Sequence, residues 1–272
     1  RRCGATARVV PNVFDFRQPA WVRDGYNADL RTACGIGVDD IVLLHTTSIL
    51  ERKGVELAID LAAELGRGEA RRRLESAPLH DGRSFGPGSR VVLLCTGYHE
   101  RWGVHGGYVA ALEQRARERG VVLCLAGDKV GHQRDVNLDG RKIYARADAY
   151  AWADAVVCPS LYEAWGNQVI ETVFARLPLA VYEYPVWTSD LAGLGFEVVS
   201  LGNEITGRDD QGLAVLPPGA AAAAADALLP LLQDAKVRGE VVEDNFRIGE
   251  RQLSFDRLSD IARELLTEVG LA

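Results

Sequence analysis

The sequence contains no methionine and no excess of basic residues. Its 31 lysines and arginines are outnumbered by 38 aspartates and glutamates, which gives a formal net charge of −7. Nucleic acids and anionic membranes attract basic proteins, so this charge argues against either as a bulk partner. No apolar run approaches the roughly 18 residues of a membrane span, and no signal peptide is visible. The missing methionine predicts a removed start or a piece of a longer protein.

Paired cysteines and several common catalytic motifs are also missing. The five cysteines are an odd number without C-x-x-C spacing. They indicate buried free thiols in a reducing compartment, which predicts a cytoplasmic location. The absence of G-x-G-x-x-G, P-loop, G-x-S-x-G and H-E-x-x-H motifs leaves four enzyme classes without their signatures: dinucleotide oxidoreductases, P-loop enzymes, lipases and zinc proteases. His99 and His105 lack accompanying acidic or cysteine ligands, and no metal site is predicted.

Short apolar runs rich in β-branched residues alternate with amphipathic segments. Helical periodicity is clear in GVELAIDLAAEL, for example. Strands separated by helices of this length indicate βαβ units. The predicted fold class is therefore α/β, a Rossmann-like, doubly wound parallel sheet with helices on both faces. The predicted strands are residues 41–45, 91–95, 121–127, 155–160, 179–184 and 196–201.

A single domain is predicted over residues 1–272, because no linker clearly divides the chain. Residues 1–20 are expected to lead into the domain, and residues 245–272 to form C-terminal helices. Residues 66–90 are rich in Gly, Arg, Pro and Ser and interrupt the strand–helix rhythm. They are predicted to be a surface insertion, part helix and part loop.

Two acidic residues flank the start of a predicted helix in PSLYEAWGNQVIE, residues 159–171. This stretch directly follows a predicted strand, so it lies at the carboxyl edge of the sheet, where such folds bind ligands. A helix beginning near Gly166 offers unpaired N–H groups to a phosphate. Carboxylates repel phosphate, but Glu163 and Glu171 could accept hydrogen bonds from hydroxyls on either side of it. A ligand with central phosphate and terminal hydroxyls is a nucleoside diphosphate sugar.

Spacing alone leaves a plainer interpretation open, in which Glu163 stabilises the helix N-terminus and Glu171 is a surface residue. However, YAWADAVVCPSLYEAWGNQVIETVFARLPLAVYEYPV resembles the E-x7-E region of family 4 glycosyltransferases, retaining enzymes of the two-domain GT-B fold. Three further segments of this sequence resemble segments of that family and occur in the same order: VVPNVFDF, ILERKGVELAIDLAAEL and VVEDNFRIGERQLSFDRL. By this resemblance the chain is one half of a GT-B enzyme, the C-terminal donor-binding domain.

The resemblance implies roles for the matching charged residues. Lys53 would bind the donor diphosphate and Glu163 would contact the transferred sugar, so these two are the expected catalytic residues. Glu171 would bind the ribose hydroxyls. The donor would be a UDP- or GDP-linked sugar. No cofactor or metal is expected, because a cation and a helix N-terminus neutralise the leaving diphosphate.

The resemblance also implies contacts from neutral residues. Backbone N–H groups of Gly166, Asn167 and Gln168 would meet the donor phosphate and sugar, and Tyr144 would border the base. Ser48 stands where the family usually has an arginine, the second cation for the diphosphate. Ser48 can donate a hydrogen bond but brings no charge, so weak donor binding or lost activity is one expectation.

Other polar residues near predicted strand ends are open candidates. Arg52 could supply the charge missing at position 48, although at a helix start we expect it to point elsewhere. His45 either approaches the donor or is simply packed. Lys129, His132 and Arg134 could form a basic rim for the nucleotide.

In the family, the segment similar to VVPNVFDF follows an N-terminal acceptor domain, and we expect that domain to be absent from this chain. The predicted function is therefore that of a donor-binding half, which alone transfers sugar poorly. Its partners would be the nucleotide sugar and an acceptor domain or partner chain; the acceptor is unknown. Two alternatives stay open: a non-catalytic or degenerate nucleotide-sugar-binding subunit, which Ser48 favours, and an epimerase or phosphorylase of the GT-B fold.

Overall fold

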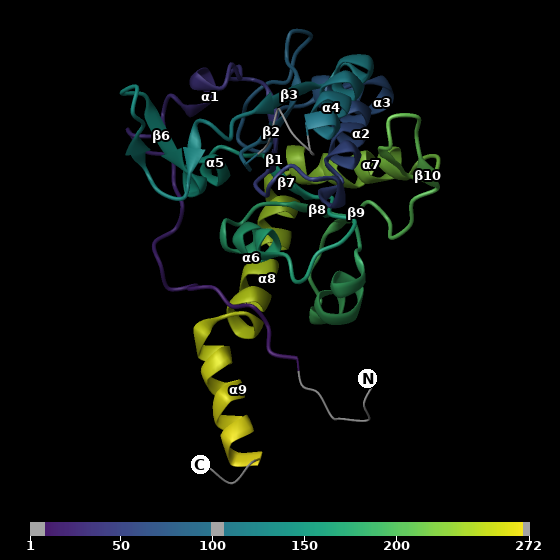
Figure 1. Ribbon diagram of the computed structural model, residues 1–272. Coiled ribbons are helices and arrows are strands. Elements are labelled where there is room, and N and C mark those ends of the chain that lie inside the picture. The colour runs from purple at the N-terminus through teal and green to yellow at the C-terminus, as the bar shows by residue number, and fades with distance from the viewer. Residues whose placement is uncertain (1–8, 99–105, 269–272) are drawn as a thin grey trace.

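A six-stranded parallel sheet forms the centre of the protein, whose computed structural model describes residues 9–98 and 106–268 (Figure 1). The strand order is β3-β2-β1-β7-β8-β9. Each strand lies within one of the six predicted ranges, and the predicted fold class is confirmed. The strands are β1 Ile41–His45, β2 Val91–Cys95, β3 Val122–Leu125, β7 Ala155–Cys158, β8 Leu179–Val181 and β9 Val199–Ser200.

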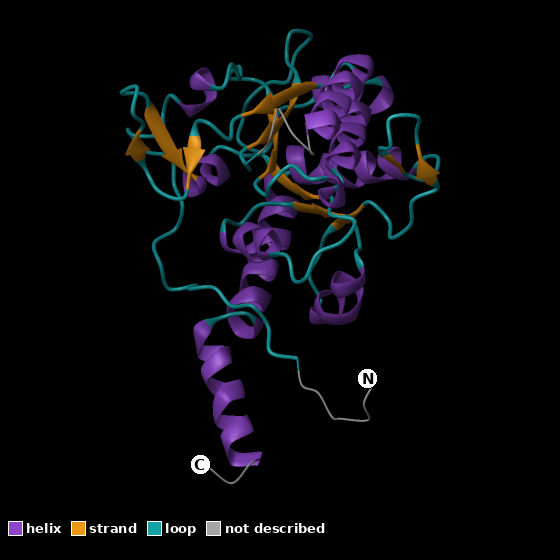
Figure 2. Cartoon of the chain, viewed as in Figure 1, coloured by secondary structure: helices purple, strands orange, loops and turns teal. Residues whose placement is uncertain are grey.

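Helices cover both faces of this sheet, which is why β1, β2 and β7 are buried over their whole length. Figure 2 shows one group of helices beside the strands and a second group on the other side. The first group is α2 Val55–Leu65, α3 Gly68–Ser76, α4 Gly106–Arg119 and α7 Ala220–Gln233; the second includes α5 Arg146–Ala151 and α6 Asn167–Phe174. Every residue of α2 except Glu64 is buried, because the sheet, α7 and the neighbouring helices enclose it.

Two small sheets and several short or peripheral helices complete the fold. Helix α9 extends away from the sheet (Figure 1). Within the described residues, no helix combines the length and the apolar character needed to cross a membrane. The peripheral strands are β4 Val130–Gly131, β5 Asp135–Val136, β6 Lys142–Ala145, β10 Gly207–Arg208 and β11 Ala214–Val215. The remaining helices are α1 Leu30–Ala33, η1 Glu51–Lys53, η2 Trp187–Leu191, η3 Ala192–Leu194, α8 Ala235–Gln252 and α9 Phe255–Glu268.

Residues 66–90 consist of α3 and a following loop, and they pack onto the domain more closely than a surface insertion would. Helix α3 contacts both α2 and α7. Leu74, Leu79 and Phe85 are buried in the same core as the sheet. Helix α3 therefore packs over α2 and α7, and the buried apolar residues hold the segment in place.

The N-terminal segment is fixed to the domain by aromatic side chains. Phe14 and Phe16 contact Phe174 of α6, with ring centroids 5.1 and 6.0 Å apart. The backbone N–H of Phe14 also donates to the carbonyl of Leu253 at the end of α8. The segment thus runs between α6 and the C-terminal helices, which brings Asn12 to the start of α6.

Candidate functional site

A cavity of about 510 Å³ opens at the carboxyl edge of the central sheet. Its walls come from the loops that follow β1, β2, β3 and β7 and from the first turn of α6. The strand order reverses at β1, since β2 and β3 lie on one side of it and β7 on the other. In open α/β sheets, ligands bind at such a reversal point. The topology therefore places the cavity where this fold binds ligands.

The structure brings most of the predicted site residues together in this one cavity. Residues that follow β1 and residues that follow β7 face each other across it. Tyr144 is the exception among the predicted residues. Those that line the cavity are Ser48, Lys53, Glu163, Gly166, Asn167, Gln168 and Glu171.

Lys53 and Glu163 form an ion pair at one end of the cavity. Lys53 is buried, and Glu163 also accepts a 3.4 Å hydrogen bond from the Ser160 hydroxyl. The pairing depends on Gly54, whose left-handed φ of 58° lets the backbone approach Pro159; a Cβ there would lie 2.4 Å from the Pro159 carbonyl oxygen. The ion pair is therefore built by close packing of η1 against the loop that follows β7.

The first turn of α6 presents backbone N–H groups to the cavity. Gly166 precedes the helix with φ 100°, a conformation that L-residues rarely adopt. No side chain among the described residues caps this helix. Uncapped first-turn N–H groups form a ready anion site. The cavity thus has both a cation and a helix N-terminus, as the sequence predicts.

Glu171 is held by two partners that the sequence analysis missed. Arg146 donates to its Oε1 at 2.8 Å, and the Tyr150 hydroxyl donates to its Oε2 at 2.9 Å. Tyr150 is buried and also lies 3.1 Å from the Thr46 hydroxyl. Because both carboxylate oxygens are engaged, Glu171 is a fixed hydrogen-bond acceptor rather than a solvated surface side chain. Arg146 and Tyr150 lie on α5, which is too short to give a clear helical pattern in the sequence.

His45 is packed beneath the cavity, which answers the question that the sequence left open. Its Nδ1 lies 3.3 Å from the carbonyl oxygen of Val157, and its Nε2 lies 3.0 Å from the Thr47 hydroxyl. Burial lowers the pKa of His45 from 6.5 to about 4, although the Val157 carbonyl and Glu163 act in the opposite direction. The ring is therefore neutral at physiological pH and supports the loop that carries Thr47.

The buried His45 predicts a loss of stability in mild acid. The unfolded chain binds a proton with pKa near 6.5 and the folded chain only near 4. The contribution of neutral His45 to the free energy of unfolding should therefore be complete above pH 6.5. It should fall by about 3 kcal/mol as the pH approaches 4. Urea unfolding of the wild type and of His45→Gln at pH 7.0 and 4.5 measures this. An equal loss of stability in both proteins would contradict it.

Arg52 lines the cavity, which corrects the expectation that it points elsewhere. Its Nη1 donates to the carbonyl of Tyr162 at 3.3 Å and lies 3.6 Å from Glu163 Oε1. Arg52 and Lys53 are neighbours in the 3-10 turn η1, and both side chains reach the loop that follows β7. A second cation is thus present near Lys53 despite the serine at position 48.

The predicted basic rim is present only in part. His132 lines the cavity. Lys129 instead donates to the Ala33 carbonyl at 2.7 Å. Arg134 pairs with Asp148, which draws its guanidinium away from the cavity. His99 and His105, the histidines considered for a metal, lie outside the described residues.

Tyr144 does not border the cavity, contrary to the expectation from the resemblance. Its ring is buried and packs edge-on against Tyr26, with centroids 6.2 Å apart. Side chains alternate along a strand, and the alternation in β6 directs Tyr144 into this packing. Val130 and Gly131 of the neighbouring strand β4 line the cavity instead.

Buried polar atoms without partners concentrate on the cavity walls. Within residues 9–98 and 106–268, the unpaired buried side-chain atoms are Thr96 Oγ1, Trp165 Nε1 and Gln168 Oε1. All three residues line the cavity. Such atoms are rare in folded proteins, since each destabilises by about 1–3 kcal/mol. Their concentration indicates a ligand-binding surface.

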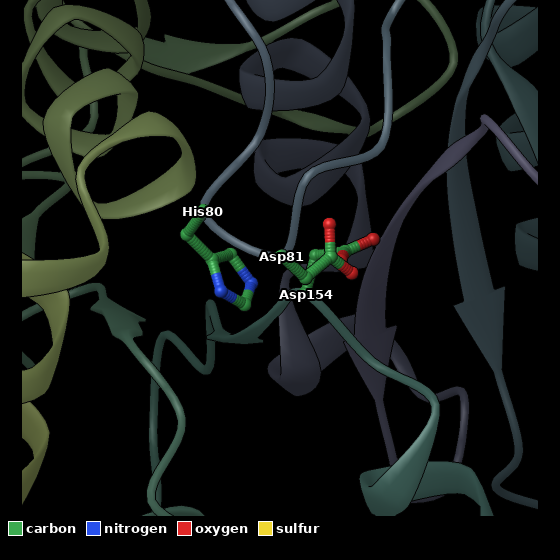
Figure 3. Close-up of side chains that lie close together, drawn as sticks. All are labelled: His80, Asp81 and Asp154. Atoms are coloured by element: carbon green, nitrogen blue, oxygen red, sulfur yellow. The ribbon is translucent and has the colours of Figure 1, made fainter.

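One group with metal-like spacing lies away from the cavity. His80, Asp81 and Asp154 approach one another before the amino end of β7 (Figure 3). Arg83 pairs with both carboxylates, and the Val42 N–H donates to Asp154 at 2.7 Å. A guanidinium already neutralises these acids, so the cluster joins the loop after α3 to the edge of the sheet.

Comparisons with known proteins give two similar sequences of known name, whereas no protein-family model matches the chain. The mannosylglucosylglycerate synthase of Petrotoga mobilis is 36% identical over 204 residues, which are 74% of this chain and 45% of that protein. The enzyme of the same name from Thermotoga maritima is 33% identical over 267 residues, 98% of this chain and 58% of that protein. The chain therefore spans about half the length of the curated relatives it matches.

Solved structures show the same fold at low sequence identity. Anabaena HepE, solved in complex with UDP and glucose, has a TM-score of 0.58 and 16% identity over 96% of this chain and 57% of its own. Sucrose-phosphate synthase from Thermosynechococcus elongatus has the same TM-score and the same identity, over 96% of this chain and 52% of its own. The C-terminal domain of LpcC, a group 1 glycosyltransferase from Francisella tularensis, has a TM-score of 0.52 and 14% identity, and 99% of it is covered. The two sequence relatives confirm the resemblance to glycosyltransferases that the sequence motifs predict, and the solved structures confirm the fold.

Proposed function

We propose that this chain is the donor-binding half of a retaining glycosyltransferase and holds a nucleoside diphosphate sugar in the cavity. The observation that carries the proposal is the convergence of Lys53, the uncapped start of α6, Glu163 and Glu171 in one cavity. The diphosphate lies between Lys53 and the helix N-terminus. Glu171 accepts hydrogen bonds from the ribose hydroxyls, and Glu163 from the transferred sugar.

Charge balance explains how such a site promotes transfer. As the bond between sugar and diphosphate breaks, negative charge grows on the leaving phosphate, and Lys53 and the α6 N–H groups stabilise it. Arg52 lies close enough to supply the charge that Ser48 lacks. The sugar leaves as an oxocarbenium-like species and keeps its anomeric configuration in the product. This chemistry requires no metal ion.

The names of the curated relatives suggest the sugar and the acceptor. Mannosylglucosylglycerate contains mannose joined to glucosylglycerate, so the proposed transferred sugar is mannose and the proposed acceptor is a glucosylglycerate. By the resemblance to family 4 glycosyltransferases, the proposed acceptor site belongs to an acceptor domain or a partner chain.

A second candidate function is a nucleotide-sugar-binding subunit without catalytic activity. Ser48 favours it, because this cavity-lining position carries no charge. Ser48→Arg separates the candidates when nucleotide affinity is measured by calorimetry. A large rise in affinity would indicate a degenerate site, whereas an unchanged affinity would indicate that Arg52 already replaces the missing charge.

Glu171→Gln is expected to weaken binding of a nucleoside diphosphate about tenfold to a hundredfold, since charge-assisted hydrogen bonds to the ribose are lost. Calorimetry with UDP, GDP and ADP measures this, and at least one of the three should bind the wild type. The 2′,3′-dideoxy form of the best ligand should bind the wild type weakly and lose nothing further in the variant.

Glu240→Gln on α8 is the matched control, because Glu240 is 65% exposed and lies outside the cavity. It should leave the affinity unchanged. Failure of all three nucleotides to bind the wild type would contradict the proposed function.

A further inference from the structure

Arg146 connects two cavity residues that sequence analysis treated separately. It is the first residue of α5, directly after β6. One terminal nitrogen, Nη1, donates to Glu171 Oε1 at 2.8 Å. The other, Nη2, lies 3.3 Å from Nδ1 of His132. All three residues line the cavity. The Arg146 guanidinium thus connects Glu171, the predicted ribose ligand, with the imidazole of His132.

The arginine determines which nitrogen of His132 carries the proton. A guanidinium has five N–H donors and no acceptor, so Nδ1 of His132 must accept the bond from Nη2. The ring proton of His132 is therefore on Nε2. This N–H has no partner among the residues that the structure describes. His132 thus offers a single, fixed hydrogen-bond donor to the cavity. Beside it, Val130 and Gly131 form an apolar part of the cavity wall.

We propose that Arg146 is a positioning residue that orients Glu171 toward the ribose and His132 toward the base, and thereby selects bases with an exocyclic carbonyl oxygen. This inference rests on the proposed function, because Glu171 must hold the ribose for the base to reach His132. Uracil and guanine carry a carbonyl oxygen at position 4 or 6, whereas cytosine and adenine carry an amino group there. The Nε2–H donor suits the carbonyl and opposes the amino group.

Calorimetry with UDP, GDP, CDP and ADP tests the selection. UDP or GDP should bind the wild-type chain about tenfold more tightly than CDP and ADP, the contribution expected of one well-made hydrogen bond. His132→Phe keeps a planar ring without a donor and should reduce this ratio to about threefold or less. Equal binding of all four nucleotides by the wild type, or an unchanged ratio in His132→Phe, would overturn the inference.

Variants of Arg146 separate positioning from direct contact with phosphate. Arg146→Lys can still pair with Glu171 but cannot reach both partners, so it should lose the base ratio and keep most of the affinity. Arg146→Gln should weaken every nucleotide as much as Glu171→Gln does, and the double variant should be no weaker than either. Arg141→Gln, on the exposed turn between β5 and β6, is the control. A loss in Arg146→Gln that is larger for diphosphates than for monophosphates would overturn the positioning role.

Nitrogen NMR of the His132 ring gives a readout that does not depend on affinity. In the wild type the Nε2–H tautomer should dominate, and in Arg146→Gln the two tautomers should be mixed. A dominant Nδ1–H form in the wild type would overturn the inference. If no nucleotide binds, both the proposed function and this inference fail. If all four bind alike, this inference fails and the proposed function stands.

Discussion

Replacing Lys53 by methionine is expected to lower the affinity for nucleoside diphosphates about a hundredfold. Lys53 is only 5% exposed and its ammonium pairs with Glu163 inside the cavity. A charge-assisted bond to a diphosphate in such surroundings contributes up to about 3 kcal/mol. Methionine preserves the length and apolar stem of the side chain, so the loss reports the missing charge. Calorimetry with the best-binding nucleoside diphosphate measures the effect.

Two controls make the result for Lys53→Met specific. The parent nucleoside, which has no phosphate, should bind the variant and the wild type alike. Lys236→Met removes a lysine that is 84% exposed and should change neither affinity. A diphosphate affinity within threefold of the wild type would show that Lys53 does not bind the phosphates, and Arg52 would become the residue to test.

Gly166→Ala should destabilise the fold by about 2–6 kcal/mol and abolish nucleotide binding. The backbone at Gly166 has φ 100°, and an added Cβ would lie 2.3 Å from the Tyr184 hydroxyl oxygen. Backbone strain of this kind costs about 1–3 kcal/mol, and overpacking of a filled site a further 1–3. Relief of the overlap would displace the first turn of α6, which is the proposed phosphate site. Urea unfolding and calorimetry measure the two effects.

Two comparisons divide the effect of Gly166→Ala into its parts. Gly68→Ala adds a Cβ at a left-handed position with φ 58° and open space around it, so it should cost only about 1 kcal/mol. Tyr184→Phe removes the hydroxyl that the new Cβ would meet. The double variant Gly166→Ala/Tyr184→Phe should therefore recover part of the lost stability. Because Tyr184→Phe also loses the 2.6 Å hydrogen bond from the hydroxyl to the Trp165 carbonyl, the recovery is measured against Tyr184→Phe alone. An equal cost of Gly166→Ala in both backgrounds would assign the whole effect to backbone strain.

The sheet and the convergence of the charged residues could be predicted from sequence because each follows from a local pattern. Apolar β-branched runs fix the six strands, and the carboxyl ends of parallel strands share one edge. Residues after 41–45 and after 155–160 then lie at one edge, and the resemblance to family 4 glycosyltransferases adds that Lys53 and Glu163 contact the same donor. The spacing of Glu163 and Glu171 around a helix start places both beside the same cavity. Their chemical roles stay predictions.

The contacts that complete the site depend on tertiary packing and carry no such local signal. Strands β4 to β6 have two to four residues each, too short for a readable alternation. The direction of Tyr144 and the approach of Arg146 to Glu171 both depend on that small sheet. Asn12 is 155 residues from Asn167, yet its amide donates to the Asn167 side chain at 2.7 Å. Only the folded chain shows such long-range pairs.

The ion pair between Lys53 and Glu163 has a consequence for which molecules can compete for the cavity. Orthophosphate and other simple salts are abundant in cells and are attracted to any lysine beside a helix N-terminus. To reach Lys53, such an anion would have to separate it from Glu163 and leave a largely enclosed carboxylate beside a second negative charge. A sugar nucleotide carries hydroxyls as well as phosphates and can offer both residues a new partner. In the proposed function, the internal counter-ion would therefore disfavour inorganic competitors.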